Sequence, residues 1–158
     1  MFRQVVRTKQ ALSEDEAKYI LSNTLRGVLA THGDDGYPYA MPLNHFYSEK
    51  DNRLYFHSGK TGHKLDALLK DNKVSYCVFN DGEQLDGNWY LTFKSVIVFG
   101  KVGYIQDKEE LYAIARDLSH KFTKDDSYIE HEIEKSGPKT LMFYIDIEHI
   151  TGKLVNER

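Results

Sequence analysis

Three apolar segments between residues 27 and 57 are separated by polar turns too short to hold a crossover helix. The segments are Gly27–Thr31, Tyr37–Tyr47 and Arg53–His57. Asp34–Gly36 is a hairpin-turn signal between the first two, and Ser48–Asn52 is a polar turn between the last two. Parallel strands need a connection of a dozen or more residues. The three segments are therefore predicted to be antiparallel neighbours.

The rest of the chain adds further strands and helices. A capping-box pair, Ser13 and Glu16, precedes an apolar face and predicts a helix. A second such start lies at Asp107 and Glu110. The other predictions are strands at Lys73–Asn80, Trp89–Ile105 and Thr140–Ile150, bulges at Gly100 and Gly103, a helix at Gly62–Lys70, a polar loop at Asp81–Asn88, and a loop with a short helix at Lys121–Lys135. Six or so mostly sequential antiparallel strands with helices at their ends predict a small, mainly β barrel.

Composition limits the classes of function. The chain has 158 residues, of which 41% are hydrophobic, so we expect one folded domain, residues 1–158, with a sizeable core. A net charge of −3 does not indicate a nucleic-acid-binding surface. The single cysteine, Cys77, excludes an intrachain disulfide and lies in a strand predicted to be buried. No segment resembles a signal peptide or reaches membrane-spanning length, so we expect no membrane partner and a cytoplasmic location.

The segment Tyr55–Asn72 is predicted to run from a strand through a turn rich in Gly, Lys and His into a helix. Backbone N–H groups beside glycines and at a helix N-terminus attract anions, and lysines add full charges, so this turn suits a phosphate. Gly59–Thr61 resembles the end of a P-loop, but Leu54 stands where the first glycine of that motif belongs. Nucleoside triphosphate hydrolysis is therefore not predicted. The alternative is an ordinary loop with a solvated basic face.

The polar residues of this turn differ in how strongly they indicate a ligand. Lys64 and Thr61 offer a charge and a hydroxyl, and both suit an anion. His57 and Ser58 end the strand and are within reach of a phosphate bound at the turn. A single histidine such as His57 or His63 is more often a surface or core residue than a ligand.

Pro42 marks a strand with an unusual backbone. Because proline donates no ladder hydrogen bond, the strand is predicted to be an edge strand or to be irregular there. Free backbone groups and the amide of Asn44 could then bind a polar ligand edge. The alternative is that Pro42 only blocks edge-to-edge pairing.

Four segments together resemble a known superfamily. They are GVLATHGDDGYPYAMPLNHFY, LYFHSGKTGHKLDAL, KSVIVFGKV and IDIEHITGK. The chain resembles the FMN-binding split-barrel proteins, which include pyridoxamine 5′-phosphate oxidase, and within them the nitroimidazole-resistance branch. The resemblance implies a six-stranded antiparallel split β-barrel of Greek-key type with flanking α-helices. It also implies a homodimer that binds FMN at the subunit interface.

The resemblance also implies which residues bind the cofactor. The flavin ring would lie along the second strand and the phosphate at the turn after the third, with two further residues near the cofactor. These residues are Met41, Pro42, Leu43 and Asn44, then His57, Ser58, Gly59, Lys60, Thr61, His63 and Lys64, then Ser95 and Val96. Trp89 is either a core or interface residue or a cover for a flavin of the partner subunit. Residues 37–47 contain no Lys or Arg, so the residues that bind vitamin B6 substrates in pyridoxamine 5′-phosphate oxidases have no counterpart there.

The function implied by the resemblance is an FMN-dependent oxidoreductase acting on a small substrate, such as a nitroaromatic compound. In such an enzyme the flavin carries the electrons and the protein holds and tunes it. The alternative is a non-catalytic flavin- or haem-binding protein of the same fold. The seven histidines show no H-x-x-x-H spacing, so no metal site is predicted. The sequence identifies no catalytic residue.

Overall fold

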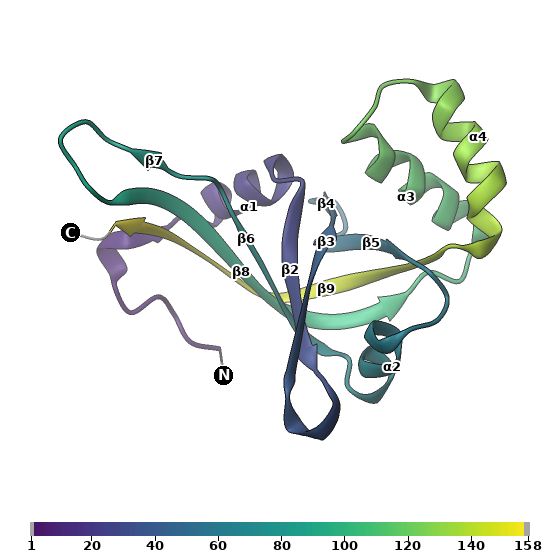
Figure 1. Cartoon of the computed structure of the whole chain (residues 1–158), viewed down its shortest axis with the longest axis horizontal. Helices are drawn as coiled ribbons and strands as arrows, with labels where there is room; N and C mark the ends of the chain where they lie inside the picture. The colour runs from purple at the N-terminus through teal and green to yellow at the C-terminus, as the bar shows by residue number, and fades with distance from the viewer. Residues whose placement is uncertain (1, 157–158) are drawn as a thin grey trace.

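The computed structural model describes residues 2–156, which form one curled antiparallel sheet with helices around it (Figure 1). The strands are β1 (Ala11–Leu12), β2 (Arg26–His32), β3 (Pro38–Asn44), β4 (Phe46–Ser48), β5 (Arg53–Ser58), β6 (Lys73–Phe79), β7 (Glu83–Gln84), β8 (Leu91–Tyr104) and β9 (Leu141–Asn156). The helices are α1 (Glu14–Asn23), α2 (His63–Lys70), α3 (Lys108–His120) and α4 (Asp126–Ser136), with 3-10 turns η1 (Thr8–Gln10), η2 (Asp34–Gly36) and η3 (Gly137–Lys139).

The sheet order is β3-β2-β6-β8-β9-β5-β4, with β1 added to β9 and β7 added to β8. The predicted mainly β split barrel with flanking helices is confirmed. Nine strands are present in the described residues instead of six. The three additional strands are the two-residue β1 and β7, and β4, which separates from the segment predicted as a single strand over residues 37–47.

Alternating burial along the strands builds the core inside the curl. Strand β2 alternates between buried and partly exposed positions, and Leu29, Phe56, Tyr76, Val96 and Phe143 are fully buried. Each fully buried side chain of this size contributes about 1.5–3 kcal/mol to stability relative to an exposed one. Cys77 departs from the prediction, because it is half-buried on the outer face of the sheet, paired between Val28 and Ile97.

Local sequence signals fix several element boundaries. The hairpin after β2 turns at Asp35 and Gly36, whose φ angles of 55° and 80° lie in the left-handed region. The capping box is present: the Ser13 N–H donates to Glu16 Oε2 at 2.9 Å, and the Glu16 N–H donates to Ser13 Oγ at 3.3 Å. A register shift between Phe99 and Gly100 confirms the first predicted bulge.

Gly103 is not a bulge, contrary to the prediction. It keeps its register opposite Tyr144 in β9. A Cβ atom at Gly103 would lie 2.5 Å from the Tyr144 ring, so the glycine makes room for that ring.

Helices α3 and α4 form a helical hairpin at one end of the molecule, and the β7 arm projects at the other end (Figure 1). Helix α4 is longer than the short helix predicted within Lys121–Lys135 and runs to Ser136. Arg116 binds Glu130 through two hydrogen bonds of 2.5 and 2.9 Å, and His120 Nε2 lies 2.8 Å from Asp126 Oδ1. These contacts hold α3 against α4. No helix in residues 2–156 is long and apolar enough to span a bilayer.

Candidate functional site

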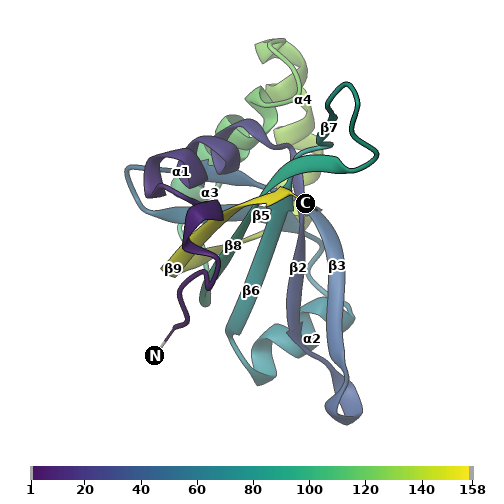
Figure 2. The same ribbon diagram turned by 90° about the vertical axis from the view of Figure 1, so that its left-hand side faces the viewer.

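The segment predicted as one strand over residues 37–47 is broken at His45. Strand β3 before the break pairs with β2, whereas β4 after it pairs with β5. The second and third predicted strands are therefore neighbours only through three residues of β4. Figure 2 shows β3 and β2 side by side, running away from β5.

His45 is fully buried at this break, and both of its ring nitrogens have partners. Nε2 lies 2.8 Å from the Leu21 carbonyl oxygen, which can only accept, so Nε2 carries the proton. The Tyr76 hydroxyl lies 2.9 Å from Nδ1 and 2.8 Å from the Leu43 carbonyl oxygen, and its single proton is donated to one of these two acceptors at a time. Burial, together with the charge of Lys121, lowers the pKa of His45 to about 4. The ring is therefore neutral and structural at neutral pH.

Lys121, at the C-terminus of α3, hydrogen-bonds the backbone at the same break in the strand. Its Nζ donates to the His45 carbonyl oxygen at 2.5 Å and to the Thr24 carbonyl oxygen at 2.8 Å. Burial lowers the pKa of Lys121 to about 8. The helical hairpin is thereby tied to the point where β3 and β4 diverge.

A split between β3 and β5 opens on the other side of His45. The β4–β5 register pairs Phe46 with Tyr55, and its continuation would pair Asn44 with His57. Because β3 turns away to β2, Asn44 and His57 instead face each other across a pocket that both of them line. Within residues 2–156, β3 has only β2 as a neighbour, and β5 beyond Tyr55 has only β9. Both facing strand edges therefore carry unpaired backbone groups.

The pocket has a volume of about 250 Å³ and lies between this split and the helical hairpin. Its lining combines apolar side chains of α3 and α4 with polar side chains. The lining side chains from the two helices include Leu111, Ala115, Leu118, Ile129, Ile133 and Glu132. Phe122 and Tyr112 also contribute to the pocket.

The turn that was predicted to bind phosphate lies beside the split. Gly62, with φ of 127°, begins α2, and its carbonyl accepts from the N–H groups of Leu65 and Asp66. The Lys64 ammonium is half-buried, 5.8 Å from the centroid of the Phe143 ring, and no carboxylate in residues 2–156 pairs with it. Burial lowers the pKa of Lys64.

His57 shares this environment with Lys64. Part of its ring is open to solvent, yet burial by the surrounding atoms and then the charge of Lys64 lower its pKa. A desolvated cation without a counter-charge beside a helix N-terminus is an arrangement that binds anions. The structure thus brings His57, Lys64 and the start of α2 together.

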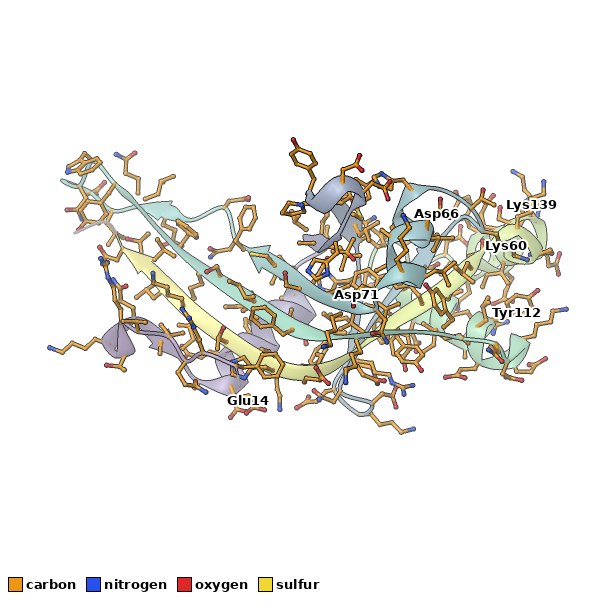
Figure 3. All side chains as sticks on the ribbon, turned by 90° about the horizontal axis from the view of Figure 1, so that it is seen from below. Glu14, Lys60, Asp66, Asp71, Tyr112 and Lys139 are labelled. Atoms are coloured by element: carbon orange, nitrogen blue, oxygen red, sulfur yellow. The ribbon has the colours of Figure 1, made fainter. Side chains whose placement is uncertain are left out.

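Other predicted residues of the turn are already engaged by the protein. Lys60 Nζ donates to the Pro138 carbonyl oxygen of η3 at 2.6 Å. The His63 ring stacks on Tyr39 of β3 at 4.1 Å, and its Nε2 lies 3.4 Å from Asp34. Figure 3 shows Lys60, Lys139 and Tyr112 at the same end of the molecule. These contacts position the turn against β3 and the helical hairpin. Gly59 and Thr61 are exposed and Ser58 is half-buried.

The predicted residues of β3 divide between the two faces of the sheet. Met41 and Leu43 pack against the core, whereas Pro42 is exposed on the outer face. The prediction of an edge strand from Pro42 is confirmed, because β3 ends the sheet. The Asn44 side-chain oxygen accepts from Arg26 Nε at 2.7 Å. Its amide NH₂ has no acceptor within residues 2–156.

Ser95 and Val96 lie far from the turn within one chain. Ser95 pairs with Lys153, whereas Ser58 pairs with Leu141 at the opposite end of β9. The separation is roughly 40 Å measured along the strand. Val96 is fully buried in the core, and its predicted place beside the cofactor stays a prediction. Trp89 is 79% exposed on the β7 arm, so it is not a core residue of this chain.

Several residues of the site were missed from the sequence. Arg26 orients Asn44, Lys121 closes the break at His45, and α4 supplies one wall of the pocket. The spacing of Leu111, Ala115 and Leu118 is typical of an apolar helix face. Nothing in that spacing indicates which partner the face covers.

Comparisons with known proteins agree with this architecture. The family model for pyridoxamine 5′-phosphate oxidase matches residues 13–154. A candidate 5-nitroimidazole antibiotic resistance protein from Bacteroides thetaiotaomicron has a similar structure, with a TM-score of 0.77, 21% identity, and coverage of 91% of this chain and 86% of that one. No curated protein sequence matches the chain.

Two further solved structures share the fold. An FAD-binding protein from Mesorhizobium loti has a TM-score of 0.63 and 25% identity over 93% of this chain and 98% of that one. An FAD- and haem-binding protein from Mycobacterium smegmatis has a TM-score of 0.68 and 18% identity over 94% of this chain and 74% of that one. With a family model that matches nearly the whole length and a split barrel in the structure, the chain belongs to the pyridoxamine 5′-phosphate oxidase family.

Proposed function

We propose that this protein binds flavin mononucleotide in the split between β3 and β5. The observation that carries the proposal is the half-buried Lys64 ammonium, which no carboxylate in the described residues pairs with, beside His57 and the start of α2. Removing this charge from water costs free energy that a bound dianionic phosphate would recover. The turn therefore suits the phosphate end of the cofactor.

The strand edges suit the other end of the cofactor. A flavin ring has a polar edge of alternating donors and acceptors, and the unpaired edge of β3 along Met41–Asn44 offers backbone groups of both kinds. Asn44 adds its amide donor, held in place by Arg26. Ser58, Gly59 and Thr61 belong to the turn between β5 and α2, and their hydroxyl and backbone groups would bind the chain that links ring and phosphate. The residues present therefore fit FMN.

A second copy of the chain would cover the outer face of the sheet. Pro42, Val28, Cys77 and Ile97 form one row across β3, β2, β6 and β8. Phe79 and Phe99 lie beside this row and are 55% and 38% exposed. An apolar sheet face of this kind is typical of a subunit interface. We therefore propose a homodimer in which FMN lies at the interface and Ser95, also on this face, is directed toward the partner.

The reaction proposed is an oxidation or reduction of a small substrate, nitroaromatic compounds included. Bound flavin would supply the redox chemistry, and the chain would bind it, orient it and limit its access to water. The proposal takes residues 1–158 as one cytoplasmic domain. The competing proposal is a flavin or haem carrier without turnover, and the FAD- and haem-binding neighbour of the same fold motivates it.

Flavin titration tests the cofactor and its placement. We expect FMN to bind with quenching of its fluorescence, and Lys64→Ala to weaken binding by about 10- to 100-fold, since a charge-assisted hydrogen bond is worth about 1.5–3 kcal/mol. Lys50→Ala, in the exposed turn after β4, is the matched control and should bind as the natural chain does. Equal affinity of both variants would contradict the placement, and no binding of FMN or FAD would contradict the cofactor.

Spectroscopy of the loaded protein separates enzyme from carrier. An enzyme should lose flavin absorbance when NADH or NADPH is added and regain it with a nitroaromatic acceptor. A carrier should show no such cycle. A Soret band after addition of haemin, with no flavin binding, would favour the haem alternative.

A further inference from the structure

The turn predicted to bind phosphate has no buried side chain of its own to anchor it. This phosphate turn, residues 59–63, runs from the end of β5 to the first residue of α2, and all five residues are exposed. An exposed turn of this kind is mobile unless contacts with other parts of the chain hold it. Two of its side chains make such contacts: Lys60 donates to the Pro138 carbonyl oxygen, and His63 packs against Tyr39.

The contact between His63 and Tyr39 crosses the open end of the split. Their rings stack with centroids 4.1 Å apart and 19° between the ring planes. Tyr39 belongs to β3, whereas His63 follows β5, and these two strands do not pair with each other in residues 2–156. The stack therefore links the two sides of the split at the end that lies away from His45.

The β2–β3 hairpin presents the partners of His63 from a closed turn. The Tyr37 N–H donates to the Asp34 carbonyl oxygen at 3.0 Å and closes that turn. The Asp34 carboxylate lies 2.5 Å from Lys70 Nζ and 3.4 Å from His63 Nε2. Figure 2 shows the hairpin beside α2. The hairpin thus contacts the first and the last residue of α2, and Tyr39 covers one face of the His63 ring.

These contacts leave His63 poorly placed to bind phosphate itself. A hydrogen bond from Lys70, together with its charge, lowers the pKa of Asp34, so this carboxylate is ionised at neutral pH. A phosphate dianion at His63 Nε2 would be repelled by that charge. Lys64, the next residue, is half-buried and pairs with no carboxylate in the described residues. The anion is therefore better placed at Lys64 than at His63.

We propose that His63 positions the phosphate turn through its stack on Tyr39 and does not bind the phosphate. The proposal rests on the proposed function, because this turn is the one placed at the phosphate of FMN. It differs from the direct role that the family resemblance implies for His63, and it adds Tyr39 as a positioning residue. A turn that is held in its binding conformation beforehand loses less conformational entropy when the ligand binds.

Two substitutions of His63 distinguish positioning from direct binding. His63→Phe keeps a planar ring on Tyr39 and removes both ring nitrogens, whereas His63→Ala removes the ring. We expect the affinity for FMN, measured by quenching of flavin fluorescence, to fall about threefold to tenfold in His63→Ala, the range that one aromatic pair contributes. His63→Phe should bind FMN as the natural chain does. Equal losses in the two variants, or no loss in either, would overturn the proposal.

Two tyrosines of the same hairpin test the partner of His63. Tyr39→Leu removes the stacked ring and should weaken FMN binding as much as His63→Ala does. Tyr37→Leu is the matched control, because Tyr37 is 75% exposed, and it should leave binding unchanged. The double variant Tyr39→Leu, His63→Ala should bind no more weakly than either single variant, since both residues act through one contact. Additive losses would overturn the proposal.

Hydrogen exchange in flavin-free protein tests the turn independently of the cofactor. The N–H groups of Leu65 and Asp66 donate to the Gly62 carbonyl oxygen at 2.9 and 3.1 Å. In Tyr39→Leu these amides should exchange about threefold to tenfold faster than in the natural chain, while Tyr37→Leu leaves them unchanged. Unchanged exchange in Tyr39→Leu would overturn the proposal. If the natural chain binds no flavin, the proposed function fails, whereas faster exchange in Tyr39→Leu still supports the contact that holds the turn.

Discussion

Two neighbouring regions meet at His45 and differ in how their polar groups are satisfied. On one side, the buried ring of His45 has partners on both nitrogens, and Lys121 donates to two carbonyl oxygens. On the other side, Asn44 and His57 face each other across a gap with unpaired strand edges, and Lys64 has no counter-charge in the described residues. The two regions use the same residue types, histidine and lysine; both lysines are half-buried, whereas His45 is fully buried and His57 is exposed.

This difference in hydrogen bonding distinguishes residues with a structural role from residues whose polar groups are left free to bind a ligand. A satisfied buried network holds a single conformation, and removing one member leaves its partners unsatisfied. An unsatisfied, partly buried charge costs stability in the free protein and recovers that cost when a ligand binds. We therefore expect substitutions in the closed region to lower stability and substitutions in the open region to lower binding.

Paired histidine substitutions give the largest expected difference. His45→Ala should lower the free energy of unfolding by about 4 kcal/mol, because it opens a cavity and leaves the Leu21 carbonyl without its donor. His57→Ala should lower it by less than about 1 kcal/mol, since its ring is partly open to solvent. Urea unfolding of both variants measures the two values. Similar losses would mean that the two regions do not differ as described.

The free energy of unfolding should depend on pH through His45. The unfolded chain binds a proton on His45 near its ordinary pKa of 6.5, whereas the folded chain does so only near pH 4. Stability should therefore fall by about 3 kcal/mol as the pH falls from 6.5 to 4. His45→Gln, which does not titrate, isolates this contribution when its unfolding is measured by urea over the same pH range. A parallel pH dependence in that variant would contradict a buried neutral His45.

The two half-buried lysines should give the smallest effects, with different signs. Lys121→Met removes two hydrogen bonds to carbonyl oxygens and should lower stability by about 2 kcal/mol at pH 7. Lys64→Met keeps an apolar stem of similar length and removes an uncompensated charge, so stability should stay the same or rise by up to about 1 kcal/mol. Thermal unfolding of flavin-free protein measures both. A clear loss of stability in Lys64→Met would indicate that Lys64 has a structural role.

Local signals in the sequence predicted most of the elements. The capping box at Ser13 and Glu16, the turn at Asp34–Gly36 and the edge position of Pro42 each depend on a few neighbouring residues, and the structure confirms all three. The resemblance to split-barrel proteins rested on such segments in their order along the chain, and the family model matches the same span. Flavin binding and its residues stay predictions.

The break at His45 and the pocket beneath α3–α4 could not be predicted in this way. Residues 37–47 form an unbroken strand pattern, and the ring that interrupts it is held by Leu21 and Tyr76, which are distant in sequence. The pocket requires α3 and α4 to pack over Asn44 and His57. The sequence by itself determined the strands, turns and helix starts, because these follow from backbone preferences over a few residues. Only the tertiary structure decided where the sheet splits. A histidine is compatible with a continuous strand, and this strand is interrupted because Leu21 and Tyr76, which are distant in sequence, hydrogen-bond the His45 ring.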